Sequence, residues 1–258
     1  MRGIALVTGA TSGIGWELAK LLAKDGYELV LVARDKKRLS ERAESLKREF
    51  NAESLVIAAD LSDIKSPERI VGALKDVEVD VLVNNAGFGD YGPFAQSDVV
   101  KQHAMIEVNV AALTVLTRLL LPGMVARKQG KILNLASTAA FQPGPLMAVY
   151  YATKAYVLSF SEALAEELHD TGVTVTALCP GPTRSEFQED SGIKRIRLVA
   201  GRSLATSAEV AKTGYRAMLA GKPLVIHGAD NTLGAFFVRF LPRSWVRRGV
   251  HWLHGEAE

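Results

Sequence analysis

The chain is poor in several features that would restrict its class at once. Cys179 is the only cysteine in 258 residues, so no intrachain disulfide can form, and its apolar neighbours in "VTVTALCPG" predict a buried thiol. No run reaches the roughly 18 uninterrupted apolar residues that are typical of a membrane span. The N-terminus lacks the long apolar segment of a secretory signal. We therefore expect a cytoplasmic protein.

An excess of charge of one sign is also missing. The chain has 31 Lys and Arg against 28 Asp and Glu, a formal net charge of +3, which gives no argument for nucleic-acid binding. It contains no Pro/Ser-rich linker, internal repeat or low-complexity tract, and we expect no metal site. With 48% hydrophobic residues, it can bury a continuous core as a single domain without disulfides or metals.

Seven short apolar runs alternate with longer segments of helical periodicity. In residues 15–26, for example, Leu18, Leu21 and Leu22 share one helical face. Strands that are apolar at nearly every residue and alternate with helices predict a parallel sheet covered on both sides. The expected fold is α/β, a Rossmann-like doubly wound sheet in a single domain. Its strands are expected at residues 4–8, 28–33, 54–59, 79–86, 130–137, 173–179 and 223–228.

A glycine-rich turn, "TGATSGIG" at residues 8–15, joins the first expected strand to the first helix. Gly9 permits a tight turn, Gly13 lets a phosphate approach the backbone, and Gly15 lets helix and strand pack closely. The helix start then presents free N–H groups to a pyrophosphate. The spacing differs from the G-x-G-x-x-G dinucleotide fingerprint, so a glycine-rich turn without a ligand is the alternative interpretation.

Five motifs in this order resemble those of the short-chain dehydrogenase/reductase family, of NADP-preferring type. They are the glycine turn, "NNAG" at 84–87, Asn109, a Ser137 with a Y-x-x-x-K pair, and "PGPT" at 180–183. They span residues 8 to 183, most of the chain. The resemblance implies cofactor contacts from Gly9, Thr11, Ser12, Gly13, Ile14, Gly15, Arg34, Asp60, Leu61, Asn85, Ala86, Gly87, Tyr150, Lys154, Pro180, Gly181 and Thr183.

The stretch "VYYATK" places two tyrosines ahead of one lysine. On a helix, Tyr150 and Lys154 are four residues apart and share a face, but Tyr151 is three residues from Lys154 and nearly shares it. Spacing therefore leaves both tyrosines open. The family pattern implies that Tyr150 is the catalytic one, which makes Tyr151 a packing or substrate-side residue.

The family's catalytic tetrad corresponds to Asn109, Ser137, Tyr150 and Lys154. Hydride addition to a carbonyl builds negative charge on oxygen, which needs a proton donor and a hydrogen bond at that oxygen. A nearby ammonium lowers the pKa of a tyrosine, so we expect Lys154 to lower the pKa of Tyr150. By resemblance, Lys154 also binds the nicotinamide ribose, Ser137 orients the carbonyl, and Asn109 holds a water that relays protons to Lys154.

The second expected strand ends "VLVARDKKRL". A carboxylate at this place binds the ribose 2′-hydroxyl of NAD, whereas an arginine accommodates the 2′-phosphate of NADP. By resemblance, Ala33 takes the carboxylate position and Arg34 follows it, which favours NADP(H). Asp35 is the alternative ligand if the register differs by a residue or two. Some NADP-preferring relatives carry a basic residue where this chain has Ser12.

The expected substrate side is apolar. "FGDYGPF" (88–94) and "TAAFQPGPLMAV" (138–149) suit a hydrophobic carbonyl compound, although Phe88, Phe141 and Leu146 could equally be core. Residues 184–205 resemble the family's substrate lid. Its apolar residues with Lys194, Arg195 and Arg197 suggest recognition of an acyl chain on a phosphate-bearing carrier, with an ordinary amphipathic lid as the alternative.

The tail after the last expected strand does not fit the alternation. It carries five phenylalanines and tryptophans with four arginines, and no acid lies between Asp230 and Glu256. Pro242 should divide it into two helices. A basic aromatic segment can lie on an anionic membrane surface, but the interpretation that we favour here is packing over the substrate cleft or across a subunit interface.

These observations predict an NADP(H)-dependent oxidoreductase that acts on a hydrophobic ketone or secondary alcohol. A 3-oxoacyl thioester is the first candidate substrate and a steroid-like ketone the second. The alternative is a non-catalytic NADP(H)-binding sensor or scaffold. The domain is expected to span residues 1–230, with residues 231–258 as an extension packed on it. By resemblance, we expect a homodimer or homotetramer.

Overall fold

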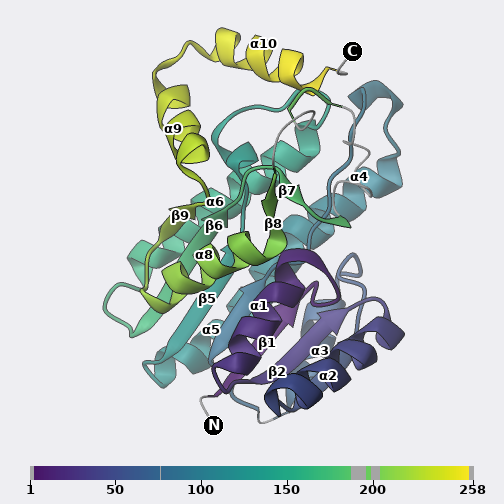
Figure 1. The fold of residues 1–258 in the computed structure, drawn as a ribbon, viewed down its shortest axis with the longest axis vertical. Coiled ribbons are helices and arrows are strands. Elements are labelled where there is room, and N and C mark those ends of the chain that lie inside the picture. The colour runs from purple at the N-terminus through teal and green to yellow at the C-terminus, as the bar shows by residue number, and fades with distance from the viewer. Residues whose placement is uncertain (1–2, 76, 187–195, 199–203, 256–258) are drawn as a thin grey trace.

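A computed structural model of the chain describes residues 3–75, 77–186, 196–198 and 204–255. Seven parallel strands form one sheet in the order β3-β2-β1-β4-β5-β6-β9 (Figure 1). This is the predicted doubly wound sheet, with its order reversing between β1 and β4. The strands are β1 (Ile4–Thr8), β2 (Glu28–Ala33), β3 (Ser54–Ala58), β4 (Val81–Asn84), β5 (Gly130–Leu135), β6 (Val173–Cys179) and β9 (Leu224–Ile226).

Helices cover both faces of this sheet. Alternate residues of β1 pack against the helices on opposite faces. On β1, Ala5 and Val7 join one core cluster, whereas Leu6 joins the cluster on the opposite face. This burial on both sides explains why the strands are apolar at nearly every position. The first face is covered by α1 (Gly13–Lys24), α2 (Lys36–Phe50) and α8 (Ser207–Leu219), and the second by α3 (Ser66–Leu74), α5 (Leu113–Ala126) and α6 (Ala148–Glu167).

The structure shortens four of the expected strands: 54–59, 79–86, 130–137 and 223–228 become Ser54–Ala58, Val81–Asn84, Gly130–Leu135 and Leu224–Ile226. In two of them the chain leaves the sheet early. The expected strand 79–86 ends at Asn84, since the N–H groups of Asn85 and Ala86 turn away to donate to the hydroxyl of Thr8. The expected strand 130–137 ends at Leu135. Both ends lie at the carboxyl edge of the sheet, where a doubly wound fold binds its ligand.

Residues Val99–Ala126 form one long helical stretch, made of α4 (Val99–Ile106), the π-helical turn η2 (Glu107–Ala112) and α5. By length and composition it could cross a membrane. Core helices of globular domains meet the same criteria, and here Met105, Leu116 and Met124 are fully buried in the domain. The stretch therefore gives only weak evidence for a membrane span.

The C-terminal segment forms two helices at one end of the molecule, beyond the carboxyl edge of the sheet (Figure 1). They are α9 (Ala229–Phe237) and α10 (Arg243–His254), joined by the short helix η4 (Val238–Phe240). Pro242 is the N-cap of α10, so the predicted division into two helices is confirmed. Val246 and Val250 of α10 pack against Met147 and Tyr151, which places the inner face of α10 over α6.

Candidate active site

The glycine turn opens the first helix towards a cavity of about 450 Å³ at the carboxyl edge of the sheet. Gly9 and Gly13 have φ angles of +66° and +57°, which side chains disfavour. At Gly15, a Cβ atom would lie 2.4 Å from the carbonyl oxygen of Gly9, so only glycine fits. The N-cap Ser12 makes no capping hydrogen bond and the first turn of α1 holds no acidic residue. This helix start is suited to an anion.

The turn after β4 is fastened to the glycine turn. The Thr8 hydroxyl accepts hydrogen bonds from the backbone N–H groups of Asn85 and Ala86, both at 3.0 Å. The Asn85 amide donates to the carbonyl oxygens of Thr8 at 3.0 Å and Gly9 at 3.2 Å. Asn85 thus lines the cavity, but its side chain serves to hold two loops together. Thr8 was not among the predicted site residues.

An arginine that the sequence analysis did not single out lies at the outer end of the cavity. Arg38 donates two hydrogen bonds to the Glu186 carboxylate, at 2.8 and 3.3 Å. These bonds lower the pKa of Glu186, which also accepts a hydrogen bond from Ser12. Asp35 accepts a hydrogen bond from the Arg38 N–H at 3.0 Å as the N-cap of α2. The cavity is thus lined by two arginines at this place: Arg34 lies just before α2, and Arg38 lies in its first turn.

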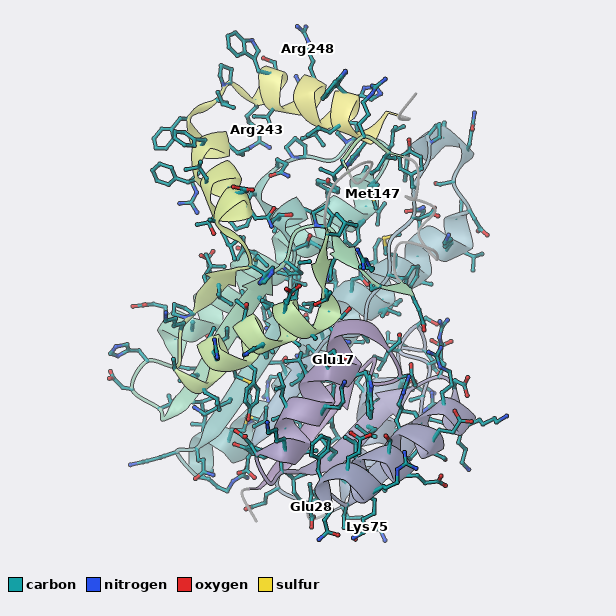
Figure 2. The ribbon with its side chains drawn as sticks, in the orientation of Figure 1. Glu17, Glu28, Lys75, Met147, Arg243 and Arg248 are labelled. Carbon is teal, nitrogen blue, oxygen red and sulfur yellow. The ribbon has the colours of Figure 1, made fainter. Side chains whose placement is uncertain are left out.

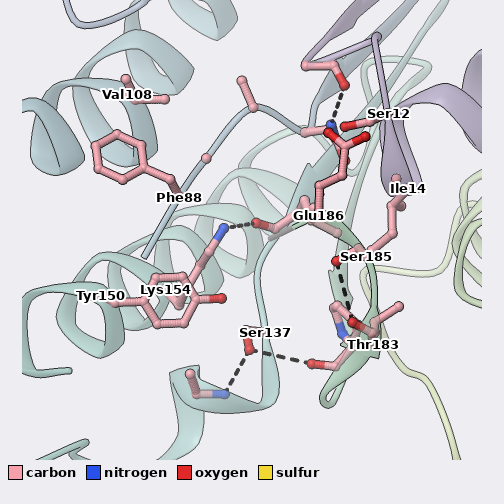
Figure 3. A pocket seen from close by; sticks show the side chains of 18 of the residues that line it. Ser12, Ile14, Phe88, Val108, Ser137, Tyr150, Lys154, Thr183, Ser185 and Glu186 are labelled. Carbon is pink, nitrogen blue, oxygen red and sulfur yellow. Dashed lines mark hydrogen bonds between the residues drawn. The ribbon is translucent and has the colours of Figure 1, made fainter. Parts of the chain in front are cut away.

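Ser137, Tyr150 and Lys154 come together on the cavity wall, as Figure 3 shows. Ser137 follows β5, where its hydroxyl caps the short helix η3 (Thr138–Phe141) and donates to the Pro180 carbonyl oxygen at 3.4 Å. It also hydrogen-bonds Tyr150. One helical turn further along α6, the Lys154 ammonium lies 5.8 Å from the centroid of the Tyr150 ring and donates to the Leu135 carbonyl oxygen at 2.6 Å.

Burial controls the proton affinities of this cluster. Desolvation raises the pKa of Tyr150 to about 12, although the Ser137 hydrogen bond opposes the rise. Desolvation also lowers the pKa of Lys154 to about 8. The expected lowering of the Tyr150 pKa by Lys154 is not observed, because loss of solvent disfavours the charged form of both groups. Tyr150 therefore keeps its proton at neutral pH, as a proton donor must.

Asn109 takes a different place from the other predicted catalytic residues. It lies in η2, is buried, and does not line the cavity. Its side-chain oxygen accepts from the Phe88 N–H at 3.1 Å, and its amide donates to the Phe88 carbonyl at 3.0 Å and to the Thr153 hydroxyl at 3.1 Å. The side chain predicted to hold a water is thus occupied in clamping the loop after β4 to α6.

Tyr151, the second tyrosine of the pair, bonds to the end of the chain. Its hydroxyl lies 2.8 Å from Nε2 of His254, while Nδ1 of the same ring lies 2.6 Å from the Pro145 carbonyl oxygen. A carbonyl only accepts, so Nδ1 carries the proton and Nε2 accepts from Tyr151. Tyr91 also donates to the His254 carbonyl at 2.7 Å. Sequence reasoning noticed the tail but missed His254.

The predicted lid, 184–205, lies largely outside the described residues, including Ile193, Lys194, Arg195 and Val199. Its two ends meet where β7 (Thr183–Arg184) pairs with β8 (Ala205–Thr206). In the described part, Ile196 is buried and Leu198 lines the cavity. Arg197 donates to the Trp252 carbonyl at 3.2 Å. This guanidinium bonds to the C-terminal end of α10, and the contact of the lid with a carrier stays a prediction.

The remaining predicted residues divide between cavity and core. Phe88 lines the cavity, whereas Phe141 packs with the core cluster around Leu113 and Val157. Cys179 is fully buried and burial raises the pKa of its thiol to about 12, so the predicted burial of the thiol is confirmed. Gly15 and Asn109 do not line the cavity. The predicted residues that do are Gly9, Thr11, Ser12, Gly13, Ile14, Arg34, Asp60, Leu61, Asn85, Ala86, Gly87, Ser137, Tyr150, Lys154, Pro180, Gly181 and Thr183.

A sheet that reverses order beside a glycine turn, with a serine, a tyrosine and a lysine on one cavity wall, defines a dinucleotide-binding type of fold equipped for proton transfer. The sequence pattern of the family described as short chain dehydrogenase matches residues 3–195. The chain belongs to the short-chain dehydrogenase/reductase family. A second pattern, described as a glycosyl transferase 4-like domain, matches residues 159–257, which is less than half of the chain.

Individual proteins that this chain resembles in sequence or structure are dehydrogenases and reductases. A very-long-chain 3-oxoacyl-CoA reductase from Rattus norvegicus is 40% identical over 182 residues, covering 68% of this chain but only 58% of the relative. A short-chain dehydrogenase from Sphingobium yanoikuyae, solved in complex with NADPH, is 31% identical with a TM-score of 0.83 over 92% of this chain and 93% of that one. A bulky-bulky ketone specific alcohol dehydrogenase from Comamonas testosteroni is 30% identical with a TM-score of 0.79, covering 92% of each chain.

Proposed function

We propose that this protein is an NADP(H)-dependent oxidoreductase that reduces a hydrophobic ketone, with a 3-oxoacyl thioester as the leading substrate class. One observation carries the proposal. A protonated Tyr150, hydrogen-bonded to Ser137 and one helical turn from a buried Lys154, faces a single cavity that also contains the start of α1. An anion site and a proton donor in one cavity are what hydride transfer to a carbonyl requires.

The residues at the outer end of the cavity fit NADP(H). The uncapped start of α1 would hold the pyrophosphate, and Arg34 and Arg38 would hold the 2′-phosphate, since a guanidinium pairs with phosphate in a fork. The carboxylate of Asp35 is engaged as the cap of α2, so it is poorly placed as an alternative ligand for a ribose hydroxyl. The relative from Sphingobium yanoikuyae, solved with NADPH, supports the same cofactor.

The tyrosine, serine and lysine have separate roles in this mechanism. The cofactor supplies the hydride when it is bound. Tyr150, whose raised pKa of about 12 keeps it protonated, donates its proton to the carbonyl oxygen, and the Ser137 hydroxyl orients that oxygen. Lys154 places a positive charge beside the tyrosine as the phenolate forms, which lowers the free energy of that state. Asn109 positions the loop after β4 by clamping Phe88.

The inner end of the cavity supports a hydrophobic substrate. Its lining includes Met147, Tyr151, Ile196 and Leu198 together with Phe88 and Val108. An apolar lining with few placed polar groups suits an acyl chain or a ring system better than a sugar. The names of two relatives, a 3-oxoacyl-CoA reductase and a bulky-ketone dehydrogenase, favour the same class.

The two adjacent tyrosines give a matched pair of variants for the test. We expect NADPH oxidation with a medium- or long-chain 3-oxoacyl thioester to fall by about 10²- to 10⁴-fold in Tyr150→Phe, the usual effect of losing a general acid. Tyr151→Phe removes a hydroxyl that bonds to His254, and it should retain the chemical step. NADPH binding, followed by fluorescence, should persist in both variants.

Equal loss of turnover in the two variants would refute the assignment of Tyr150. Binding of NADPH without turnover on thioesters, steroid-like ketones or bulky aryl ketones would instead favour a cofactor-binding sensor. Turnover on ketones but not on thioesters would retain the reductase and remove the leading substrate.

A further inference from the structure

The C-terminal cap, residues 229–254, has an outer face that the rest of the domain leaves uncovered. Phe236, Phe237, Phe240, Trp245 and Trp252 are 53% to 69% exposed. Three of them form one cluster. The centroid of the Phe236 ring lies 5.6 Å from that of Phe237 and 5.2 Å from that of Phe240. Contiguous exposed aromatic side chains are rare on monomeric soluble proteins and mark an interaction surface. We call these five residues the aromatic face.

Helix α10 has one side that is buried against the domain and one side that is exposed. Val246, Val250 and His254, spaced by four residues, are buried against the domain, where the two valines pack with Met147 and Tyr151. The other side of the helix carries Trp245, Arg248 and Trp252, which are three and four residues apart and so share a face. Arg248 points away from the domain in Figure 2. Packing on the domain explains why the two valines and the histidine of the inner side are buried. It does not explain why α10 carries exposed tryptophans.

After Asp230 at its start, the cap carries charge of one sign only. Arg239, Arg243, Arg247 and Arg248 are exposed, and no acidic residue lies between Asp230 and Glu256. Among the residues that the structure describes, none of the four arginines makes an ion pair with a carboxylate. Such a face would repel an identical face on a second copy across a two-fold axis, but it complements a surface of anionic headgroups.

We propose that the C-terminal cap docks on an anionic lipid surface. The aromatic face would enter the region between headgroups and acyl chains, where tryptophan is favoured, and the four arginines would contact the headgroup phosphates. Because His254 at the C-terminal end of α10 lines the cavity, docking would bring that part of the cavity wall near the lipid. The docking surface does not depend on the substrate proposed above.

The first test uses the full chain and vesicles that are sedimented by centrifugation. We expect the protein to sediment with phosphatidylcholine vesicles that contain phosphatidylglycerol and to stay in solution with phosphatidylcholine alone. The variant Arg243→Gln/Arg247→Gln/Arg248→Gln should lose on the order of a hundredfold in partition, the effect of removing three basic groups near an anionic surface. All three side chains are exposed, so the fold should persist.

A matched control removes the same charge from the opposite end of the molecule. Lys24 and Arg48 are exposed near the C-terminal ends of α1 and α2, and Lys222 is exposed just after α8. The triple change to Gln should leave vesicle binding intact. Phe240→Ser/Trp245→Ser should abolish it with all charges retained. Equal losses in the two charge variants would overturn the proposal, because binding would then follow net charge alone.

Two further outcomes would also overturn it. One is wild-type protein that stays in the supernatant with anionic vesicles. The other is a dimer, measured by analytical ultracentrifugation, that Phe240→Ser/Trp245→Ser converts to monomer, which would make the aromatic face a contact between two copies.

Discussion

The ion pair between Arg38 and Glu186 makes a prediction about cofactor choice. Both side chains are partly exposed, at 39% and 52%, so their pairing contributes only about 0–1 kcal/mol. A 2′-phosphate can therefore displace the carboxylate at little cost. A fork of charge-assisted hydrogen bonds from guanidinium to phosphate contributes about 1.5–3 kcal/mol, which corresponds to roughly 10- to 150-fold in affinity.

Arg38→Ala should accordingly weaken NADPH binding by roughly 10- to 150-fold and leave NADH binding nearly unchanged. Glu186→Gln removes the competing carboxylate and should tighten NADPH binding by up to about fivefold, the equivalent of about 1 kcal/mol. Both effects should shrink as salt is added, since the groups are exposed to solvent. The measurement is titration of each purified variant with NADPH and with NADH, followed by nicotinamide fluorescence.

Arg48→Ala provides the matched control, because Arg48 is an exposed residue of the same helix and does not line the cavity. It should bind both cofactors as the wild type does. If Arg38→Ala weakened NADPH and NADH equally, Arg38 would be supporting the loop and not reading the phosphate. If Glu186→Gln weakened NADPH, the carboxylate would be a positioning group and not a competitor.

Two further predictions concern buried titrating groups. The pKa of Lys154 is about 8 in the folded protein and 10.5 in a free lysine. Between these two pH values the unfolded chain binds more protons than the folded one, so the free energy of unfolding rises with pH in this window. Relative to Lys154→Met, the wild type should gain roughly 3 kcal/mol across this window in urea unfolding; a constant difference would refute the assignment. Burial also lowers the pKa of His254 below 6.5, so its contribution to stability should fade as pH drops below that value. His254→Ala should cost about 1–3 kcal/mol at neutral pH by stranding Tyr151 and the Pro145 carbonyl, and an unchanged unfolding midpoint would contradict this.

The sheet and the position of the site follow from local patterns in the sequence. Strand β1 is apolar on both faces because each face has its own helical cover, and such runs are distinguished from half-exposed strands by composition alone. Because parallel strands all end at one edge, the residues after β1, β4, β5 and β6 lie near one another. The cavity lined by Gly9, Ala86, Ser137 and Pro180 shows that they do.

The parts that the sequence did not predict are contacts between distant side chains. Arg38 meets Glu186 across 148 residues, and Tyr151 meets His254 across 103. Neither contact leaves a periodic signal, because each uses a single side chain from each partner segment. Asn109 was predicted from its motif, but its partners were not, since Phe88 and Thr153 come from other segments of the chain. Motifs therefore located residues more reliably than they assigned the contacts of those residues.

The cavity has two halves with different origins along the chain. The glycine turn, the loop after β4 and the residues Ser137, Tyr150 and Lys154 all lie within residues 3–195, the region that matches the family. Beside Tyr151, the wall is built from Ile196, Leu198 and His254, which lie beyond that region. Hydrogen bonds from Leu198 to the Leu253 carbonyl and from Arg197 to the Gly255 carbonyl join these segments to each other. A segment of this chain outside the family pattern thus shapes the space in which the proposed substrate would lie, so the C-terminal end of α10 would bear on the choice of that substrate.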